Sequence, residues 1–115
     1  MTITIYHNPK CSKSRQTLEL LKEKGLTPII HEYLKTPPTA EELKVILALL
    51  KMSPRDLIRK KEAIYAELEL DNSSLTDDDL IDFMVLHPIL IERPIVLANG
   101  KAALGRPPEQ VLDIL

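Results

Sequence analysis

The chain has 115 residues, the size of one ordinary domain with a two- or three-layer core. Its hydrophobic content of 44% and charged content of 28% are typical of a soluble globular protein. No apolar run approaches the roughly 18 residues that span a bilayer, so no membrane association is expected. The net charge of −2 and the few aromatic residues, one Phe, three Tyr and no Trp, argue against nucleic acid as a partner.

The N-terminal stretch predicts a strand, a helix and a second strand. Residues 3–7, ITIYH, alternate in polarity and are rich in β-formers, and no basic region typical of a signal peptide precedes them. The pattern that follows predicts a helix that begins near Ser12 and stops before Gly25, which suits the position after a helix C-terminus. Residues 27–34, TPIIHEYL, are expected to form the next strand.

The middle of the chain, from about residue 39 to 87, is predicted to be helical. Three helix starts are marked by residues that cap N-termini or favour the first turn. They are Thr39 with Glu42 at N3, Ser53 with Pro54 at N1 in a helix expected over 53–70, and Thr76 followed by three acidic residues. Pro88 ends the last of these helices.

Strands return near the C-terminus. Residues 94–104 contain two short apolar runs around Asn99-Gly100, a strong signal for a β-hairpin. The last residues, 105–115, predict a helix entered through Pro107 or Pro108. The order is therefore β-α-β, a helical block, then β-β-α, and no linker or repeat separates the pieces. We expect a single α/β domain over residues 1–115, in which both ends form one sheet and the helical block at about 39–87 is inserted.

The single cysteine, Cys11, lies in a polar turn between the first strand and the first helix. A free cysteine is usually buried as a small hydrophobic residue, but the neighbours of Cys11 are residues of loops and helix caps. A thiolate there would be favoured by the helix dipole, which contributes about 0.3–1 kcal/mol. Lowering a thiol pKa by about two units requires roughly 2.7 kcal/mol. A reactive thiolate therefore needs a further cation: Lys10, Lys13, His7 or one from elsewhere in the chain.

The spacing around Cys11 excludes several kinds of site. A dithiol oxidoreductase would have its second cysteine where this chain has Ser14, so an oxidised Cys11 needs an external thiol. A phosphatase loop would have arginine at position 17, which is Thr17, and Arg15 comes too early. Zinc sites usually need clustered ligands, whereas the histidines are scattered. They are His7, His31 and His87.

With these residues in view, the sequence resembles the arsenate reductase family that depends on glutathione and glutaredoxin. The resemblance covers essentially the whole chain and is carried by four segments in order: YHNPKCSKSRQTL, LIRKKE, LIERPIV and LGRPPEQVL. Ser12-Lys13 stands where the better-studied detoxification members have Gly-Thr, which matches a widespread chromosomal branch of the family.

The resemblance implies a thioredoxin-like fold with a four-stranded mixed sheet flanked by helices, and a cis bond at Arg93-Pro94. It also implies a role for each matched residue: Cys11 as nucleophile, Arg59, Arg93 and Arg106 as ligands of the oxyanion, and His7 and Ser14 as residues that tune the cysteine. Arsenate would be the substrate and glutathione a co-substrate, with glutaredoxin as partner and no bound cofactor. A cytoplasmic monomer that serves arsenic detoxification is expected.

Three other functions remain open for the same residues. The chain could be a non-enzymatic redox sensor that is glutathionylated at Cys11, or an Spx-like regulator that binds RNA polymerase. It could also be a general monothiol transferase, which would need no oxyanion arginines. By residue pattern alone, Arg93 and Arg106 could equally be surface arginines in salt bridges, and Arg59 a solvated helix charge.

Overall fold

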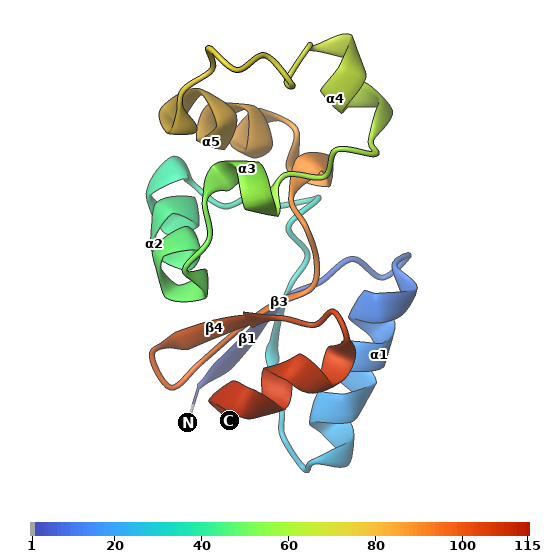
Figure 1. The fold of residues 1–115 in the computed structure, drawn as a ribbon. Coiled ribbons are helices and arrows are strands. Elements are labelled where there is room, and N and C mark those ends of the chain that lie inside the picture. Colours follow the sequence, from blue (N-terminus) through green and yellow to red (C-terminus); the bar gives the residue numbers. More distant parts are fainter. Residues whose placement is uncertain (1) are drawn as a thin grey trace. The chain divides into compact units, whose positions relative to one another are not determined.

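The computed structural model describes residues 2–115, and the chain forms two compact units (Figure 1). The first unit combines Met1–Thr36 with Arg93–Leu115, and the second is Pro37–Glu92. No helix within residues 2–115 has both the length and the apolar character required to span a bilayer.

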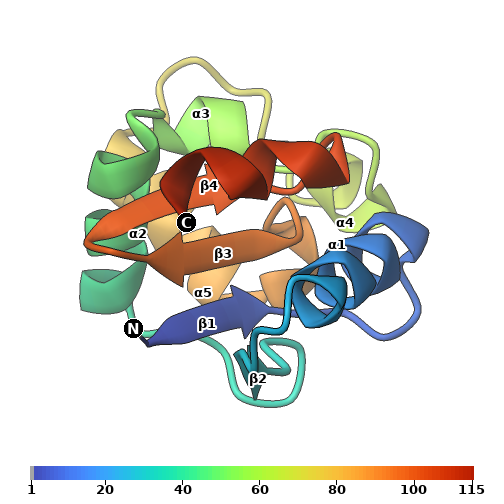
Figure 2. The same ribbon diagram turned by 90° about the horizontal axis from the view of Figure 1, so that it is seen from below.

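The first unit is built on a four-stranded mixed sheet with the order β2-β1-β3-β4 (Figure 2). β1 runs parallel to β2 and antiparallel to β3, and β3 and β4 form an antiparallel hairpin. The strands are β1 (Ile3–Tyr6), β2 (Ile29–His31), β3 (Ile95–Ala98) and β4 (Lys101–Leu104). The expected α/β architecture with a sheet formed by both ends of the chain is therefore confirmed.

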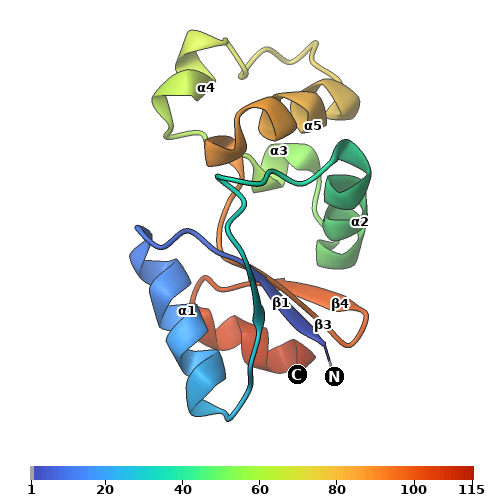
Figure 3. The ribbon, with the colours of Figure 1, turned by 180° about the vertical axis from the view of Figure 1, so that it is seen from behind.

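Two helical segments cover one face of this sheet, α1 (Ser12–Glu23) and η2 (Pro108–Ile114), which lie beside each other in Figure 3. Gly25 follows α1 with a φ of +76°, a conformation that costs little for glycine, so the predicted helix stop is confirmed. The buried residues between helices and sheet form the core of this unit. They are Ile3, Ile5, Leu21, Val96, Ala98, Val111 and Ile114.

The C-terminal segment η2 is a 3-10 helix, not the α-helix that the sequence suggests. Its buried residues are Pro108, Val111 and Ile114, which are spaced three apart. Because a 3-10 helix has three residues per turn, this spacing places all three side chains on one face, against the core. The hairpin prediction is confirmed: Asn99 and Gly100 have φ values of 55° and 70°, as a type I′ turn requires.

The second strand is shorter than expected. Only Ile29, Ile30 and His31 pair with β1, whereas residues 27–34 were predicted to be extended. The chain leaves the sheet after His31 because the backbone N–H groups of Lys35 and Thr36 both donate to the Glu32 carbonyl, 3.0 Å away in each case. A turn therefore replaces the end of the strand.

The second unit is helical, and its α5 packs against α2 and α3. Its elements are α2 (Ala40–Leu50), α3 (Pro54–Leu57), α4 (Ala63–Glu67), α5 (Asp77–Leu86) and the 3-10 turn η1 (Pro88–Leu90). Three of the helices begin with a capping box, in which the N-cap hydroxyl and the N3 carboxylate bond each other's backbone N–H. The pairs are Thr39 with Glu42, Ser53 with Asp56, and Thr76 with Asp79.

The helix expected over 53–70 is wrong in its extent. It is broken at Ile58, which is extended and forms an isolated antiparallel bridge with Ile91. The Arg59 N–H donates to the Leu90 carbonyl at 2.7 Å, and the Glu92 N–H donates to the Leu57 carbonyl at 3.1 Å. These long-range backbone bonds replace the local bonds that would have continued the helix.

Candidate active site

Cys11 is the N-cap residue of α1, with extended backbone angles of φ −93° and ψ 124°. Its N–H donates to the Asn8 carbonyl at 3.0 Å, which closes the turn between β1 and α1. Its own carbonyl accepts the first helical hydrogen bond, from the Arg15 N–H at 3.0 Å. The residue is 8% exposed. The sulfur is thus held at the positive end of the helix dipole.

The pKa of the Cys11 thiol lies below its ordinary value. Burial raises this pKa, but a hydrogen bond from the Arg93 side chain, the Ser14 N–H, the charge of Arg93 and the Lys13 N–H together lower it by more. Arg93 is therefore the cation that the thiolate requires, and the contribution of Lys13 comes from its backbone. The ammonium groups of Lys10 and Lys13, which were candidates for this role, are not among the causes of the shift.

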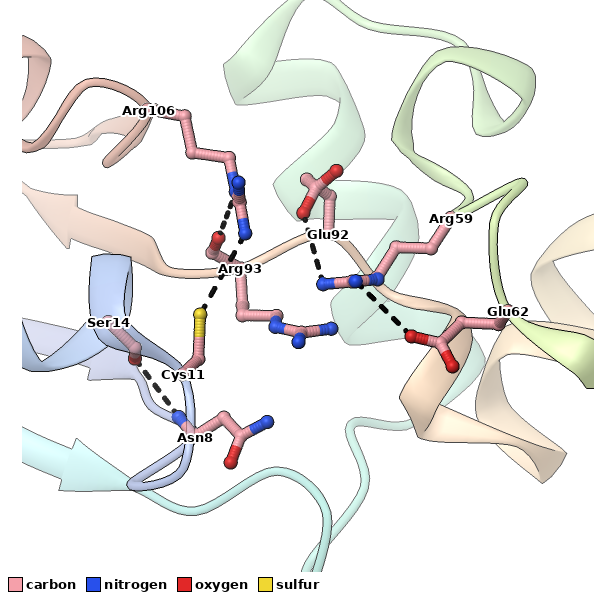
Figure 4. A network of polar contacts seen from close by, with 8 residues as sticks. All are labelled: Asn8, Cys11, Ser14, Arg59, Glu62, Glu92, Arg93 and Arg106. Carbon is pink, nitrogen blue, oxygen red and sulfur yellow. Dashed lines mark hydrogen bonds and ion pairs between the residues drawn. The ribbon is translucent and has the colours of Figure 1, made fainter.

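Arg106 connects the sulfur to the backbone of Arg93 (Figure 4). Its Nε donates to the Arg93 carbonyl at 2.8 Å, and its Nη2 lies 3.8 Å from the Cys11 sulfur. The first distance is ordinary for an N–H···O hydrogen bond, and the second is a longer contact with the sulfur. The Nε of Arg106 is thus held by the Arg93 carbonyl, and its Nη2 faces the thiol.

The hydroxyl of Ser14 forms hydrogen bonds with the turn that precedes Cys11. Its Oγ accepts a hydrogen bond from the Asn8 N–H at 3.0 Å and shares another, at 2.8 Å, with Nδ1 of His7. All three residues are buried. Burial lowers the pKa of His7, against the opposing effect of Glu32, so the ring is held in its neutral form near neutral pH. His7 therefore orders the turn and supplies no positive charge to the thiolate there.

Gly105 allows the two arginine segments to approach α1. A Cβ at this position would collide with Thr17 Oγ1 and would lie 2.7 Å from Pro94 Cγ. The Gly105 N–H donates to the Pro94 carbonyl at 2.9 Å. The segment that follows β4 is thereby fixed against the segment that precedes β3. The peptide bonds Arg93-Pro94 and Arg106-Pro107 are both cis; the first was expected, and the second was not.

Arg59 belongs to the second unit, where two carboxylates hold its guanidinium (Figure 4). Nη2 lies 3.2 Å from Glu62 Oε1, and Nη1 lies 3.5 Å from Glu92 Oε1. All three side chains are less than one third exposed, Arg59 at 18%. Its expected role as an oxyanion ligand stays a prediction.

Five of the six residues expected at the site are thus found together in the first unit, namely Cys11, Arg93, Arg106, His7 and Ser14. Asn8 was not among the residues expected at the site, although an Asn-Pro pair before the cysteine is a typical turn signal. The pairing of Arg59 with Glu92 was not expected either, since no local pattern gives a signal for it. Within residues 2–115, no three His, Cys, Asp or Glu side chains are grouped as a metal site would need.

The first unit therefore presents an acidic thiol beside two guanidinium groups and the backbone N–H groups of a helix start. Such a set of donors suits a negatively charged, oxygen-rich group next to a nucleophilic sulfur. Because arginine forms planar, bidentate contacts with tetrahedral oxyanions, the arrangement favours attack on an oxyanion over simple thiol exchange.

Comparisons with known proteins point in the same direction. The model of the ArsC family matches residues 6–114. An arsenate reductase from Neisseria meningitidis serogroup B is 51% identical over 98% of this chain and 97% of its own length. An uncharacterised Escherichia coli K12 protein, YfgD, is 57% identical over 98% of this chain and 96% of its own length. The solved structure of an arsenate reductase from Vibrio cholerae is 54% identical and superposes with a TM-score of 0.98 over 100% of this chain and 98% of that one.

Proposed function

Because the chain belongs to the ArsC family, we propose that it is an arsenate reductase that uses Cys11 as its nucleophile. The observation that carries the proposal is the position of Arg93 and Arg106 beside the Cys11 sulfur at the start of α1. Relatives at about 50% identity over nearly the whole chain are named arsenate reductases, which supports the same activity here.

The first chemical step is attack of the Cys11 thiolate on arsenic. A sulfur–arsenic bond forms, and one arsenate oxygen leaves with a proton as hydroxide or water. Arg93 and Arg106 bind the remaining oxygens and stabilise the charge that develops on them during the displacement. By its match to the family, Arg59 is proposed as a third ligand of the anion. The Ser14 N–H, at the start of α1, stabilises the sulfur while it is negatively charged.

Reduction then needs two external electrons, because the chain has a single cysteine. We propose that glutathione attacks the adduct: the sulfur–arsenic bond breaks, its electron pair passes to arsenic, and arsenite leaves. The oxidised product is a mixed disulfide between Cys11 and glutathione, which glutaredoxin reduces. These reagents and a free thiol belong to a reducing compartment, so the reaction is proposed to take place in the cytoplasm, with the protein acting as a monomer.

The test is a coupled assay of arsenite formation with purified protein, glutathione and glutaredoxin. The wild type should convert arsenate, and Cys11→Ser should lose turnover, because serine is not ionised at neutral pH. Cys11→Ser should keep the thermal stability of the wild type, since serine is a good N-cap residue. Retained turnover in this folded variant would contradict the nucleophile assignment.

A second outcome would favour the redox sensor. If the wild type forms no arsenite yet is rapidly glutathionylated at Cys11 by oxidised glutathione, the site acts on thiols and not on arsenate. Thioltransferase activity that is unaffected by Arg106→Ala would point to the general transferase instead.

A further inference from the structure

The turn before Cys11 is organised by one side chain, that of Asn8. Its Oδ1 accepts a hydrogen bond from the Lys10 N–H at 3.0 Å, its backbone N–H donates to Ser14 Oγ at 3.0 Å, and its carbonyl accepts from the Cys11 N–H at 3.0 Å. The residue is 7% exposed. Asn8 has four polar groups: the backbone N–H, the backbone carbonyl, Oδ1 and Nδ2. The first three form the turn that carries the thiol.

The fourth group, the Nδ2 amide nitrogen, has no hydrogen-bond partner within the part of the chain that the structure describes, residues 2–115. It is also not among the polar atoms that are completely buried without a partner. It is therefore an unused donor that is not completely buried. The Lys10 bond fixes which end of the amide is the oxygen, because only an oxygen can accept from a backbone N–H.

The direction of this donor follows from the same bond. With Oδ1 turned towards the Lys10 N–H, Nδ2 points away from it, and Figure 4 shows it on the side where the Arg93 guanidinium lies next to Cys11. A side chain that served only the turn would not need an amide, because an aspartate or serine oxygen could accept the same bond. The amide adds a donor beside the nucleophile.

We propose that Asn8 is a substrate-binding residue whose Nδ2 donates a hydrogen bond to an oxygen of the bound oxyanion. The inference deepens the proposed function, since it assigns a further ligand for the same substrate class at the same site. Arg93 and Arg106 supply charge, whereas the Asn8 amide supplies a neutral donor of fixed direction on a rigid turn. A tetrahedral oxyanion has more acceptor positions than two guanidinium groups fill, so the additional donor has an oxygen to bind.

A direct test on the unmodified protein is NMR with selectively 15N-labelled asparagine. The chain has three asparagines, so three side-chain amide pairs are expected. Titration with sodium arsenate and, separately, sodium phosphate should shift the Asn8 pair. Asn99, whose Nδ2 already donates to the Ile114 carbonyl at 2.9 Å, should stay in place and serves as the internal control. An Asn8 pair that does not move while the arginine Nε signals shift would overturn the proposal.

Two variants separate substrate binding from support of the turn. Asn8→Ser and Asn8→Asp both retain a side-chain oxygen for the Lys10 N–H, and both remove the amide donor. The readout is protection of Cys11 from iodoacetamide by arsenate, which requires no turnover. Losing a hydrogen bond to a charged group should raise the half-protecting arsenate concentration about tenfold or more in Asn8→Ser. The loss should be greater in Asn8→Asp, whose negative charge also repels the anion.

Stronger protection by arsenate in Asn8→Asp than in Asn8→Ser would contradict the inference. A purely structural Asn8 predicts wild-type protection in Asn8→Ser, because the serine oxygen can support the same turn without adding a charge. If Asn8→Ser changes the alkylation rate of the free thiol but not the protection by arsenate, Asn8 acts on the sulfur and the inference fails. Absence of arsenite formation by the wild type, together with normal anion protection, would refute the reductase activity and leave the role of Asn8 intact.

Discussion

The acidity of Cys11 depends on a residue that lies far from it in the sequence. The start of α1 contributes less than the roughly 2.7 kcal/mol that two pKa units require, and Arg93 supplies both a hydrogen bond and a charge. The side chains of Lys10 and Lys13, which are among the candidates that the sequence offers, do not account for the shift. The thiol is thus activated by tertiary structure, which brings the start of β3 to the end of β1.

Replacing Arg93 by glutamine should therefore raise the pKa of Cys11. Below the pKa, each unit by which it rises lowers the thiolate fraction about tenfold, so alkylation by iodoacetamide at neutral pH should slow accordingly. The pH dependence of the alkylation rate measures the pKa directly. Arg15→Gln is the matched control, since Arg15 is exposed and donates to the Pro9 carbonyl instead. Equal profiles for Arg93→Gln and the wild type would show that Arg93 does not activate the thiol.

Neutral His7 makes stability depend on pH. Its pKa is lowered in the folded state, mainly by burial, so the unfolded chain binds a proton at a higher pH than the folded one. Stability should therefore fall as the pH drops below the unfolded value of about 6.5. His7→Asn, which retains a polar group for Ser14, should show a smaller loss of melting temperature between pH 7 and pH 5. A parallel pH dependence in both proteins would contradict this account.

Among the elements, the residues where helices begin could be predicted from the sequence, whereas the residues where several elements end could not. Capping boxes depend on residues three apart, so Thr39, Ser53 and Thr76 could be identified as N-caps directly. The break at Ile58 could not, because it results from pairing with Ile91, a distant residue with no local signal. Long-range backbone pairing overrides helix propensity wherever it satisfies the same N–H and carbonyl groups.

Gly105 gives a prediction about the segment between β4 and η2. Gly105→Ala should destabilise the fold by about 1–3 kcal/mol, since its Cβ would be forced against Thr17 and Pro94. It should also displace Arg106 and lower kcat/KM. Denaturant unfolding and the coupled assay measure both effects.

Gly25→Ala is the matched control for this variant. A Cβ at Gly25 would meet no atom within 4 Å, but the backbone φ of +76° is unfavourable for alanine. Gly25→Ala should therefore lower the free energy of unfolding by about 1–2 kcal/mol. Its kcat/KM should equal that of the wild type. If Gly105→Ala has full activity and stability, the close approach described for Gly105 does not constrain the segment.

For the molecule as a whole, local patterns predicted the strand and helix order and the hairpin, and they marked Cys11 as the candidate nucleophile. The arginines were assigned through a resemblance, since no local pattern distinguishes Arg93 from a surface arginine. The pairing of Arg59 with Glu92 could not be predicted, because the fold of the second unit brings these distant residues together, whereas Glu62 is only three residues away from Arg59. Charge balance at a site is a property of tertiary structure, and composition does not reveal it.

The two glutamates offset the charge of Arg59, which leads to a prediction for the complete protein. If Arg59 binds the anion, Glu62→Gln and Glu92→Gln should each lower KM for arsenate up to about fivefold, the range expected for one partly exposed ion pair. Asp78→Asn, which removes an exposed pair with Lys44, is the control and should leave KM unchanged. Higher KM values in both glutamine variants would mean that the carboxylates hold Arg59 in its binding orientation.

The bond from Arg106 Nε to the Arg93 carbonyl has a consequence for the energetics of substrate capture. It joins the two guanidinium-bearing segments before any anion arrives, so the conformational entropy of gathering them is lost during folding and not during binding. If Arg106 binds the oxyanion as proposed, affinity is then not reduced by the ordering of its long, flexible side chain when the anion arrives.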